Sequence, residues 1–151
     1  MRALIQRVKR SSVSIDGKVH SSIGPGMLIL LGVRQTDQEQ DADYLADRCV
    51  ALRIFDDPEG KMNLSVKDTG GSIMVVSQFT LYGDTRKGNR PSYSDAAGPE
   101  LAEKLYDCFV KRLSVALGKE KVATGIFRAM MDVELVNDGP VTVSVESKTP
   151  S

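Results

Sequence analysis

Residues 71–83 read Gly-Ser-Ile-Met-Val-Val-Ser-Gln-Phe-Thr-Leu-Tyr-Gly, an apolar run that passes into uncharged polar residues. The run follows a Gly-Gly turn, and its composition predicts a buried strand over residues 72–82. Polar groups at the end of a buried strand need hydrogen-bond partners or stay open for a ligand. Residues 77–80 are therefore the first candidate for a functional site.

The length and composition predict one domain without a strong overall charge. We expect the 151 residues to form a single domain over 1–146, followed by a short polar tail over 147–151. Twenty basic and twenty acidic residues cancel, so any contact with a nucleic acid has to come from local basic clusters. The N-terminal residues resemble no leader and no long apolar run occurs, which predicts a cytoplasmic protein without membrane contact.

Hydrophobic periodicity predicts a mixed α and β fold. Strands are expected over 2–9, 12–16, 27–31, 131–135 and 141–146, with a hairpin at Asp16-Gly17. One helix should begin at a capping box over 36–39 and end near residue 52, and a second should run from Pro99 to Gly118. We therefore expect an α+β fold with a curved, mostly antiparallel, barrel-like sheet and two main helices.

The side-chain inventory leaves few options for catalysis. His20 is the one histidine, so a Ser-His-Asp or Cys-His arrangement would have to include it. Cys49 and Cys108 fall on apolar helix faces, which favours buried small hydrophobic residues. Asp132 and Glu134 share one strand face, which favours a solvated face over an acid–base pair. A His-rich or Cys-rich metal site is excluded, and we expect neither a metal nor a cofactor.

Two separated motifs resemble a known enzyme family. Ser77-Gln78-Phe79-Thr80-Leu81 and Asn137-Asp138-Gly139-Pro140-Val141-Thr142 are similar to the signature motifs of the D-aminoacyl-tRNA deacylases, also called D-tyrosyl-tRNA deacylases. Further similar segments follow the family's order, at 5–8, 52–55, 60–65 and 87–92. The resemblance covers most of residues 1–146. It implies hydrolysis of the ester bond in D-aminoacyl-tRNA, and in mischarged glycyl-tRNA, with L-aminoacyl-tRNA rejected.

The resemblance also implies roles for individual residues. The implied catalytic residues are Ser77, Gln78, Phe79 and Thr80. Gly139 and Pro140 are implied to form a cis dipeptide that one subunit inserts into the site of the other, so a homodimer with an interfacial site is expected. Arg7 is similar to the residue that braces this pair, and Met131 and Asn137 are expected to support the site. The residues alone favour an ordinary turn between two strands at Gly139-Pro140.

A cationic loop is the candidate contact for the RNA. Arg86, Lys87 and Arg90 lie within five residues of each other, beside the polar end of the predicted strand. Such a loop suits a phosphate backbone, with a solvated surface loop as the alternative. The resemblance favours aminoacyl-tRNA as the partner, and DNA is not expected. Arg128 departs from the family, which generally has glycine or alanine there, and a narrowed pocket mouth, a phosphate contact and plain exposure are all open.

The chemistry needs no conventional base. An aminoacyl ester is already activated, and the neighbouring ribose hydroxyl can help to position water. Backbone amides around 77–80 are expected to stabilise the oxyanion, each contributing roughly 3 kcal/mol. Thr80 is the alternative nucleophile, although its hydroxyl has an unfavourable pKa without an activating base. Two rival functions stay open: a small-ester hydrolase that uses Thr80, and a non-catalytic RNA-binding module.

Overall fold

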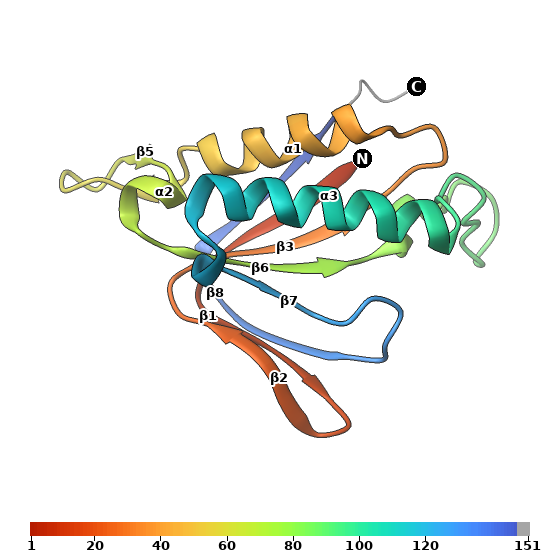
Figure 1. Cartoon of the computed structure of the whole chain (residues 1–151), viewed down its shortest axis with the longest axis horizontal. Helices are drawn as coiled ribbons and strands as arrows, with labels where there is room; N and C mark the ends of the chain where they lie inside the picture. The colour runs from red at the N-terminus through yellow and green to blue at the C-terminus, as the bar shows by residue number, and fades with distance from the viewer. Residues whose placement is uncertain (148–151) are drawn as a thin grey trace.

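The computed structural model describes residues 1–147, and Figure 1 shows two long helices packed over one side of a curved sheet. The strands are β1 (Arg2–Ile15), β2 (Lys18–Ile23), β3 (Gly26–Gly32), β4 (Phe55–Asp56), β5 (Met62–Leu64), β6 (Ser72–Ser77), β7 (Val122–Thr124) and β8 (Asp132–Glu146). The helices are α1 (Glu39–Ala51), α2 (Val66–Thr69) and α3 (Pro99–Leu117), with 3₁₀ turns η1 (Phe79–Tyr82) and η2 (Lys119–Lys121). Within this range no helix has both the length and the apolar character that a membrane span requires.

The main sheet has both antiparallel and parallel neighbours. β1 pairs antiparallel with β2, β3 and β8, as the alternating patterns predicted. β3, β6 and β7 pair in parallel, because α1 and α3 carry the chain back across one face of the sheet between them. The predicted α+β fold with two main helices, α1 and α3, is confirmed, whereas the parallel pairings were not foreseen.

The sheet curls until its two ends nearly meet. The Ser21 hydroxyl on β2 donates to the Thr124 carbonyl on β7 at 2.7 Å, although β2 and β7 stand at opposite ends of the strand order. Figure 1 shows both strands on the side of the molecule away from the two long helices. The predicted barrel-like curvature is therefore confirmed.

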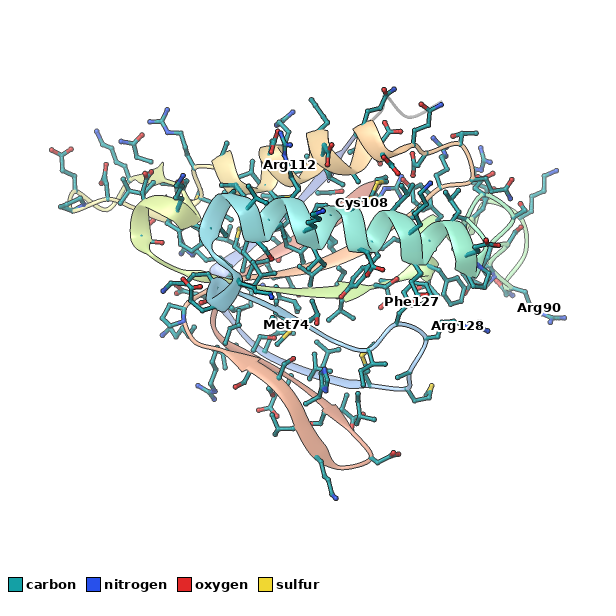
Figure 2. The ribbon with its side chains drawn as sticks, viewed as in Figure 1. Met74, Arg90, Cys108, Arg112, Phe127 and Arg128 are labelled. Carbon is teal, nitrogen blue, oxygen red and sulfur yellow. The ribbon has the colours of Figure 1, made fainter. Side chains whose placement is uncertain are left out.

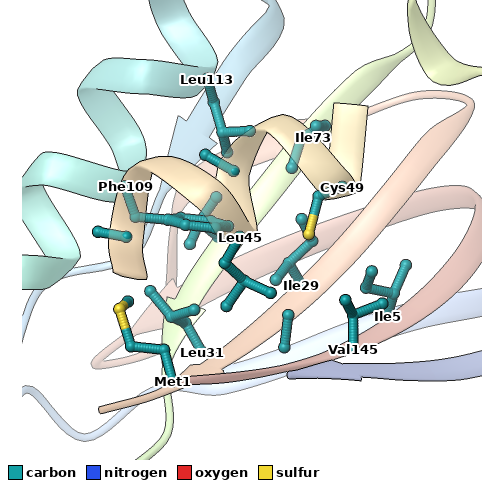
Figure 3. Packing of buried hydrophobic residues seen from close by; sticks show 14 of the residues in the cluster. Met1, Ile5, Ile29, Leu31, Leu45, Cys49, Ile73, Phe109, Leu113 and Val145 are labelled. Carbon is teal, nitrogen blue, oxygen red and sulfur yellow. The ribbon is translucent and has the colours of Figure 1, made fainter. Parts of the chain in front are cut away.

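The main core lies between the helices and the sheet. Figure 3 shows Leu45 of α1 and Phe109 of α3 among side chains of the strands, and both are wholly buried. The Tyr106 hydroxyl on α3 donates to the Val75 carbonyl at 2.8 Å. A second cluster fills the inside of the curve and contains Val8, Val13, Leu28, Met74 and Val76. β6 is covered on both faces, which explains why residues 73–76 form an unbroken apolar run.

Several predicted strand boundaries are wrong. The strands expected over 2–9 and 12–16 are one strand, because β1 changes its partner from β3 to β2 without a break. The strands expected over 131–135 and 141–146 also merge, into β8, whose pairing with β1 shifts register on both sides of Val8. The predicted hairpin is confirmed, since Asp16 and Gly17 both take positive φ, 52° and 77°.

The first helix begins later than predicted. The N-cap of α1 is Gln38, whose N–H donates to the Asp41 carboxylate at 2.8 Å, so the capping box expected over 36–39 is wrong. Asp37 does not cap the helix; its buried carboxylate pairs with the Met1 ammonium at 2.8 Å. The Ser147 N–H in turn donates to the Met1 carbonyl, and the rest of the predicted tail, 148–151, lies outside the described residues.

Candidate active site

The predicted catalytic segment leaves the sheet as a tight turn. β6 ends at Ser77, and the Gln78 N–H makes a last bond to the Leu31 carbonyl of β3 at 2.8 Å. The chain then folds into η1, so the strand predicted over 72–82 is wrong beyond Ser77. The Phe79 and Thr80 N–H groups precede the first internal bond of this turn, which the Leu81 N–H makes to Gln78. Those two donors therefore have no acceptor inside the turn.

The side chains of this segment are only partly enclosed. Ser77 and Gln78 are half-buried, Thr80 is exposed, and 55% of Phe79 is exposed. The Gln78 side-chain amide contacts the Thr80 hydroxyl. An amide cannot accept the proton that a nucleophilic hydroxyl must lose, so this arrangement gives Thr80 a hydrogen-bond partner and no base.

The turn is held in place by Arg2, which the sequence did not single out. The Arg2 Nη1 donates to the Leu81 carbonyl at 2.7 Å, and its Nε donates to the Glu146 carboxylate at 2.6 Å. Its guanidinium also lies 4.8 Å from the centre of the Tyr82 ring, which Arg34 approaches to 5.5 Å. The ends of β1 and β8 thus anchor the end of β6.

The loop after the turn brings an aromatic ring and cations to the same place. Tyr93 lies against Phe79, with the two ring centres 5.2 Å apart in an edge-to-face arrangement. The carboxylate of Asp84 pairs with the Arg86 guanidinium at 2.7 and 2.9 Å, which holds the pKa of Asp84 at about 2. The remaining two predicted tRNA contacts, Lys87 and Arg90, are exposed, and no carboxylate pairs with them among residues 1–147.

The second motif is a bulge in β8 that Arg7 braces. Arg7 is 7% exposed, and it donates to the Asp138 carbonyl at 3.0 Å and to the Ile54 carbonyl at 2.8 Å. Gly139 and Pro140 are exposed, and the peptide bond between them is cis. β8 runs through this segment and pairs with β1 on either side of it, so the segment is a bulge within one strand and not a turn between two strands.

Asn137 closes the same bulge. Its side-chain carbonyl accepts the Val141 N–H at 2.9 Å, and its amide donates to the Thr142 hydroxyl at 3.0 Å. Gly139 has φ of 136°, and a side chain there would meet the Val141 nitrogen at 2.9 Å. The bulge consequently presents backbone at its tip.

One chain does not bring the two motifs together. Arg7 stands opposite Met27 in the sheet, whereas Ser77 stands beside Leu31, four residues further along β3. At about 3.3 Å per residue and 4.8 Å per strand, with β1 and β3 between β8 and β6, the motifs lie on the order of 20 Å apart.

The remaining candidate residues are Met131, His20 and the two cysteines. Met131 lies just before β8 and packs on Gly125, whose N–H donates to the Val75 carbonyl, so it lies beside β6. His20 is exposed on β2, and Cys49 is buried, which raises the pKa of its thiol to about 12. Cys108, which was also expected to be buried, is half-buried against the core. No group of three potential metal ligands occurs within residues 1–147.

Comparison with known proteins places this geometry in a family. The family model described as D-Tyr-tRNA(Tyr) deacylase matches residues 4–146. The chain belongs to this deacylase family. It is 56% identical over 146 residues to the D-aminoacyl-tRNA deacylase of Carboxydothermus hydrogenoformans, covering 97% of this chain and 99% of that protein. It is 57% identical over 148 residues to the D-aminoacyl-tRNA deacylase of Desulfatibacillum aliphaticivorans, covering 98% and 100%.

Solved structures agree with the deacylase fold. A structure described as c-Myc DNA Unwinding Element Binding Protein superposes with a TM-score of 0.93 at 38% identity, covering all of both chains. Another, described as a probable eukaryotic D-amino acid tRNA deacylase, gives a TM-score of 0.80 at 18% identity, covering 96% of this chain and 98% of that one. The second likeness concerns the fold alone. The family resemblance inferred from the two motifs is thus confirmed.

Proposed function

We propose that this protein hydrolyses the ester bond of D-aminoacyl-tRNA and releases the free D-amino acid. The observation that carries the proposal is the family match over residues 4–146, which includes both motifs. The relatives at 56–57% identity are named for this activity and cover nearly the whole chain. Glycyl-tRNA is included as a substrate, because glycine is achiral and has no side chain that could collide with a wall that rejects L-amino acids.

The catalytic groups in this proposal are backbone amides. The Phe79 and Thr80 N–H groups are available at the start of η1, and the anchoring of Leu81 by Arg2 keeps them in a fixed direction. Fixed donors that face the developing oxyanion contribute roughly 3 kcal/mol each to the rate. The 2′-hydroxyl of the terminal ribose then positions the attacking water. Neither step requires a metal or a side-chain base.

Selectivity is assigned to the bare backbone of Gly139 and Pro140. A rigid main-chain wall beside the ester rejects an L side chain by collision and leaves room for the opposite hand. Arg7 supports this wall through the carbonyl that precedes Gly139. Because the two motifs of one chain are far apart, we assign the wall at each ester site to a second copy, in a homodimer.

Proline at position 79 tests the backbone role. F79P removes the Phe79 N–H at the first position of a turn, where proline is accommodated, and the preceding Gln78 lies outside the α region, with φ of −142° and ψ of 86°. F79A removes the ring and keeps the N–H. With D-Tyr-tRNA, we expect F79P to turn over about 100-fold more slowly than F79A. Equal rates for the two variants would refute backbone catalysis.

Alanine at position 80 tests the rival mechanism. T80A should reduce turnover of D-Tyr-tRNA less than tenfold, with T85A as the exposed control. Abolished turnover, together with an acyl-enzyme trapped in the parent protein, would establish Thr80 as the nucleophile instead.

Subunit mixing tests the shared site. F79P and G139A are each expected to be poorly active or unselective. A mixed dimer should regain one intact site, made from the turn of the G139A chain and the bulge of the F79P chain. No recovery of selective hydrolysis after mixing, with exchange verified by mass spectrometry, would contradict a site built by two copies.

Nucleic-acid binding without hydrolysis is the second candidate function. It is favoured by the 38% identical structure whose name refers to a DNA element. Purified protein incubated with D-Tyr-tRNA and L-Tyr-tRNA separates the two functions, since binding without preferential release of the D-amino acid supports the binding module. A duplex DNA competitor should not slow release if tRNA is the partner.

A further inference from the structure

Arg128 occupies a backbone position that suits glycine. The Ala129 N–H donates to the Ile126 carbonyl at 3.2 Å, which makes residues 126–129 a turn with Arg128 third. Arg128 has φ of 69°, in the left-handed region, and the third position of such a turn favours glycine for that reason. The strain of a side chain at this position is of the order that folded structures retain at functional sites. This explains physically why glycine suits the position and arginine does not.

The side chain of Arg128 is an exposed cation that pairs with no carboxylate among the described residues. The preceding residue, Phe127, packs against the core with its ring centre 6.1 Å from that of Tyr106. Phe127 therefore holds the turn against the core, and no hydrogen bond or ion pair of the Arg128 side chain within residues 1–147 offsets the backbone strain.

Parallel pairing places Arg128 at the edge that holds the proposed catalytic turn. β7 pairs with β6 up to Thr124, which stands beside Val75, and the Gly125 N–H still donates to the Val75 carbonyl. The chain after Thr124 therefore emerges next to the chain after Ser77, because parallel strands end at the same edge. Figure 1 shows the loops that follow β6 and β7 at the same end of the molecule.

This edge collects cations from two loops. Lys87 and Arg90 come from the loop after η1, and Arg128 comes from the loop after β7. Figure 2 shows Arg90 and Arg128 toward the same end of the molecule. The net charge of the chain is zero, so this gathering of cations is local.

We propose that Arg128 binds a backbone phosphate near the 3′ end of the tRNA, as a contact added to the proposed deacylase site. The inference rests on the proposed function, because the substrate there supplies the anion. The aminoacyl group carries a positive ammonium, which repels a guanidinium, so this group is not the partner of Arg128. The anionic groups of the substrate are its phosphates. A guanidinium can grip one of them with two parallel hydrogen bonds.

Glutamine at position 128 isolates the charge. R128Q keeps a side chain at the strained φ, so a change in binding reports the lost cation. R128K keeps the charge, and K119Q is the matched control because Lys119 is exposed on η2, at the opposite end of β7. kcat/KM would be measured with D-Tyr-tRNA and with 3′-O-(D-tyrosyl)adenosine, which contains no phosphate, at several salt concentrations.

R128Q is expected to lower kcat/KM for D-Tyr-tRNA about fivefold at low salt, and the loss should shrink as salt rises. The slope of log kcat/KM against log salt should decrease in size by about 0.7, the value for one phosphate contact on a single strand. The loss on the adenosine ester should be at least threefold smaller. R128K and K119Q should retain the parental slope.

Three results would overturn the assignment: no loss on D-Tyr-tRNA at low salt, an unchanged slope, or equal losses on both substrates, which would place Arg128 at the mouth of the pocket. A parent protein that releases no D-tyrosine would refute the proposed function instead. In that case the salt slope of binding to uncharged tRNA, compared between parent and R128Q, still decides whether Arg128 contacts phosphate.

Discussion

Replacing Arg7 with alanine should destabilise the protein and loosen the bulge that carries Gly139. Arg7 is buried and donates to the carbonyls of Asp138 and Ile54. A hydrogen bond from a charged donor contributes about 1.5–3 kcal/mol. Its ion pairs with Asp56 and Asp138 add little, because those carboxylates are 52% and 41% exposed. Removing the buried charge also relieves some desolvation, so we expect a net loss of about 3 kcal/mol.

Urea and thermal unfolding would measure this loss. For a protein of this size, 3 kcal/mol corresponds to a fall in Tm of roughly 6–12 °C. R10A is the matched control, since Arg10 lies on the same strand and is exposed, and it should change the free energy of unfolding by less than about 0.5 kcal/mol. R7K keeps the charge and loses the planar fork, so its stability should fall between those of R7A and the parent.

The functional consequence of R7A should be weaker discrimination between the hands of the amino acid. The ratio of release rates for D-Tyr-tRNA and L-Tyr-tRNA would be measured well below the Tm of the variant. We expect this ratio to fall at least tenfold, because the carbonyl before Gly139 loses its donor. If R7A is as stable as R10A, the bracing role is refuted. If R7A is less stable yet equally selective, the link between Arg7 and the proposed wall is refuted.

Three further outcomes follow from burial and charge. R86Q should raise the pKa of Asp84 from about 2 toward its ordinary 3.8, as an NMR titration would show. In the parent, the contribution of the pair to stability should be lost as pH falls from 3.8 to about 2. A titration midpoint that R86Q leaves unchanged would be inconsistent with the pair. Burial raises the pKa of Cys49 from 9.0 to about 12, so its folded thiol should resist alkylation at pH 8, as mass spectrometry would show, and its contribution to stability should decline as pH rises above 9.0. F109A should cost about 3–5 kcal/mol in urea unfolding, and V115A on the exposed face of α3 less than about 0.5 kcal/mol.

Residues next to each other in the sequence were enough to predict helix α3 and the first hairpin, because turn and cap residues mark the ends of both. α3 begins at Pro99 and is followed by Gly118, because proline suits a first helical turn and glycine suits the position after a helix. The hairpin at Asp16-Gly17 has the same kind of origin, since both residues tolerate positive φ.

Features that depend on distant partners were not predictable in this way. β6 ends at Ser77 because its pairing with β3 goes no further than the bond from the Gln78 N–H to the Leu31 carbonyl. The order of apolar and polar residues in β6 does not show where this pairing ends. Arg2 anchors Leu81 across 79 positions in the chain, and no spacing rule connects them. The positive φ of Arg128 was hidden as well, because arginine carries no turn signal of its own.

If the bulge and the η1 turn build one site, as proposed, the sheet allows this only between two copies of the chain. β1 and β3 lie between β8 and β6, so a single chain could join the bulge to the η1 turn only by breaking their pairing. That pairing surrounds Ile5, Met27 and Ile29, which are wholly buried, and its loss would expose the centre of the core. A second copy brings an identical bulge without such a cost. We therefore infer that selectivity depends on protein concentration, and a dilute monomer that still prefers D-Tyr-tRNA, with its mass verified in solution, would contradict this conclusion.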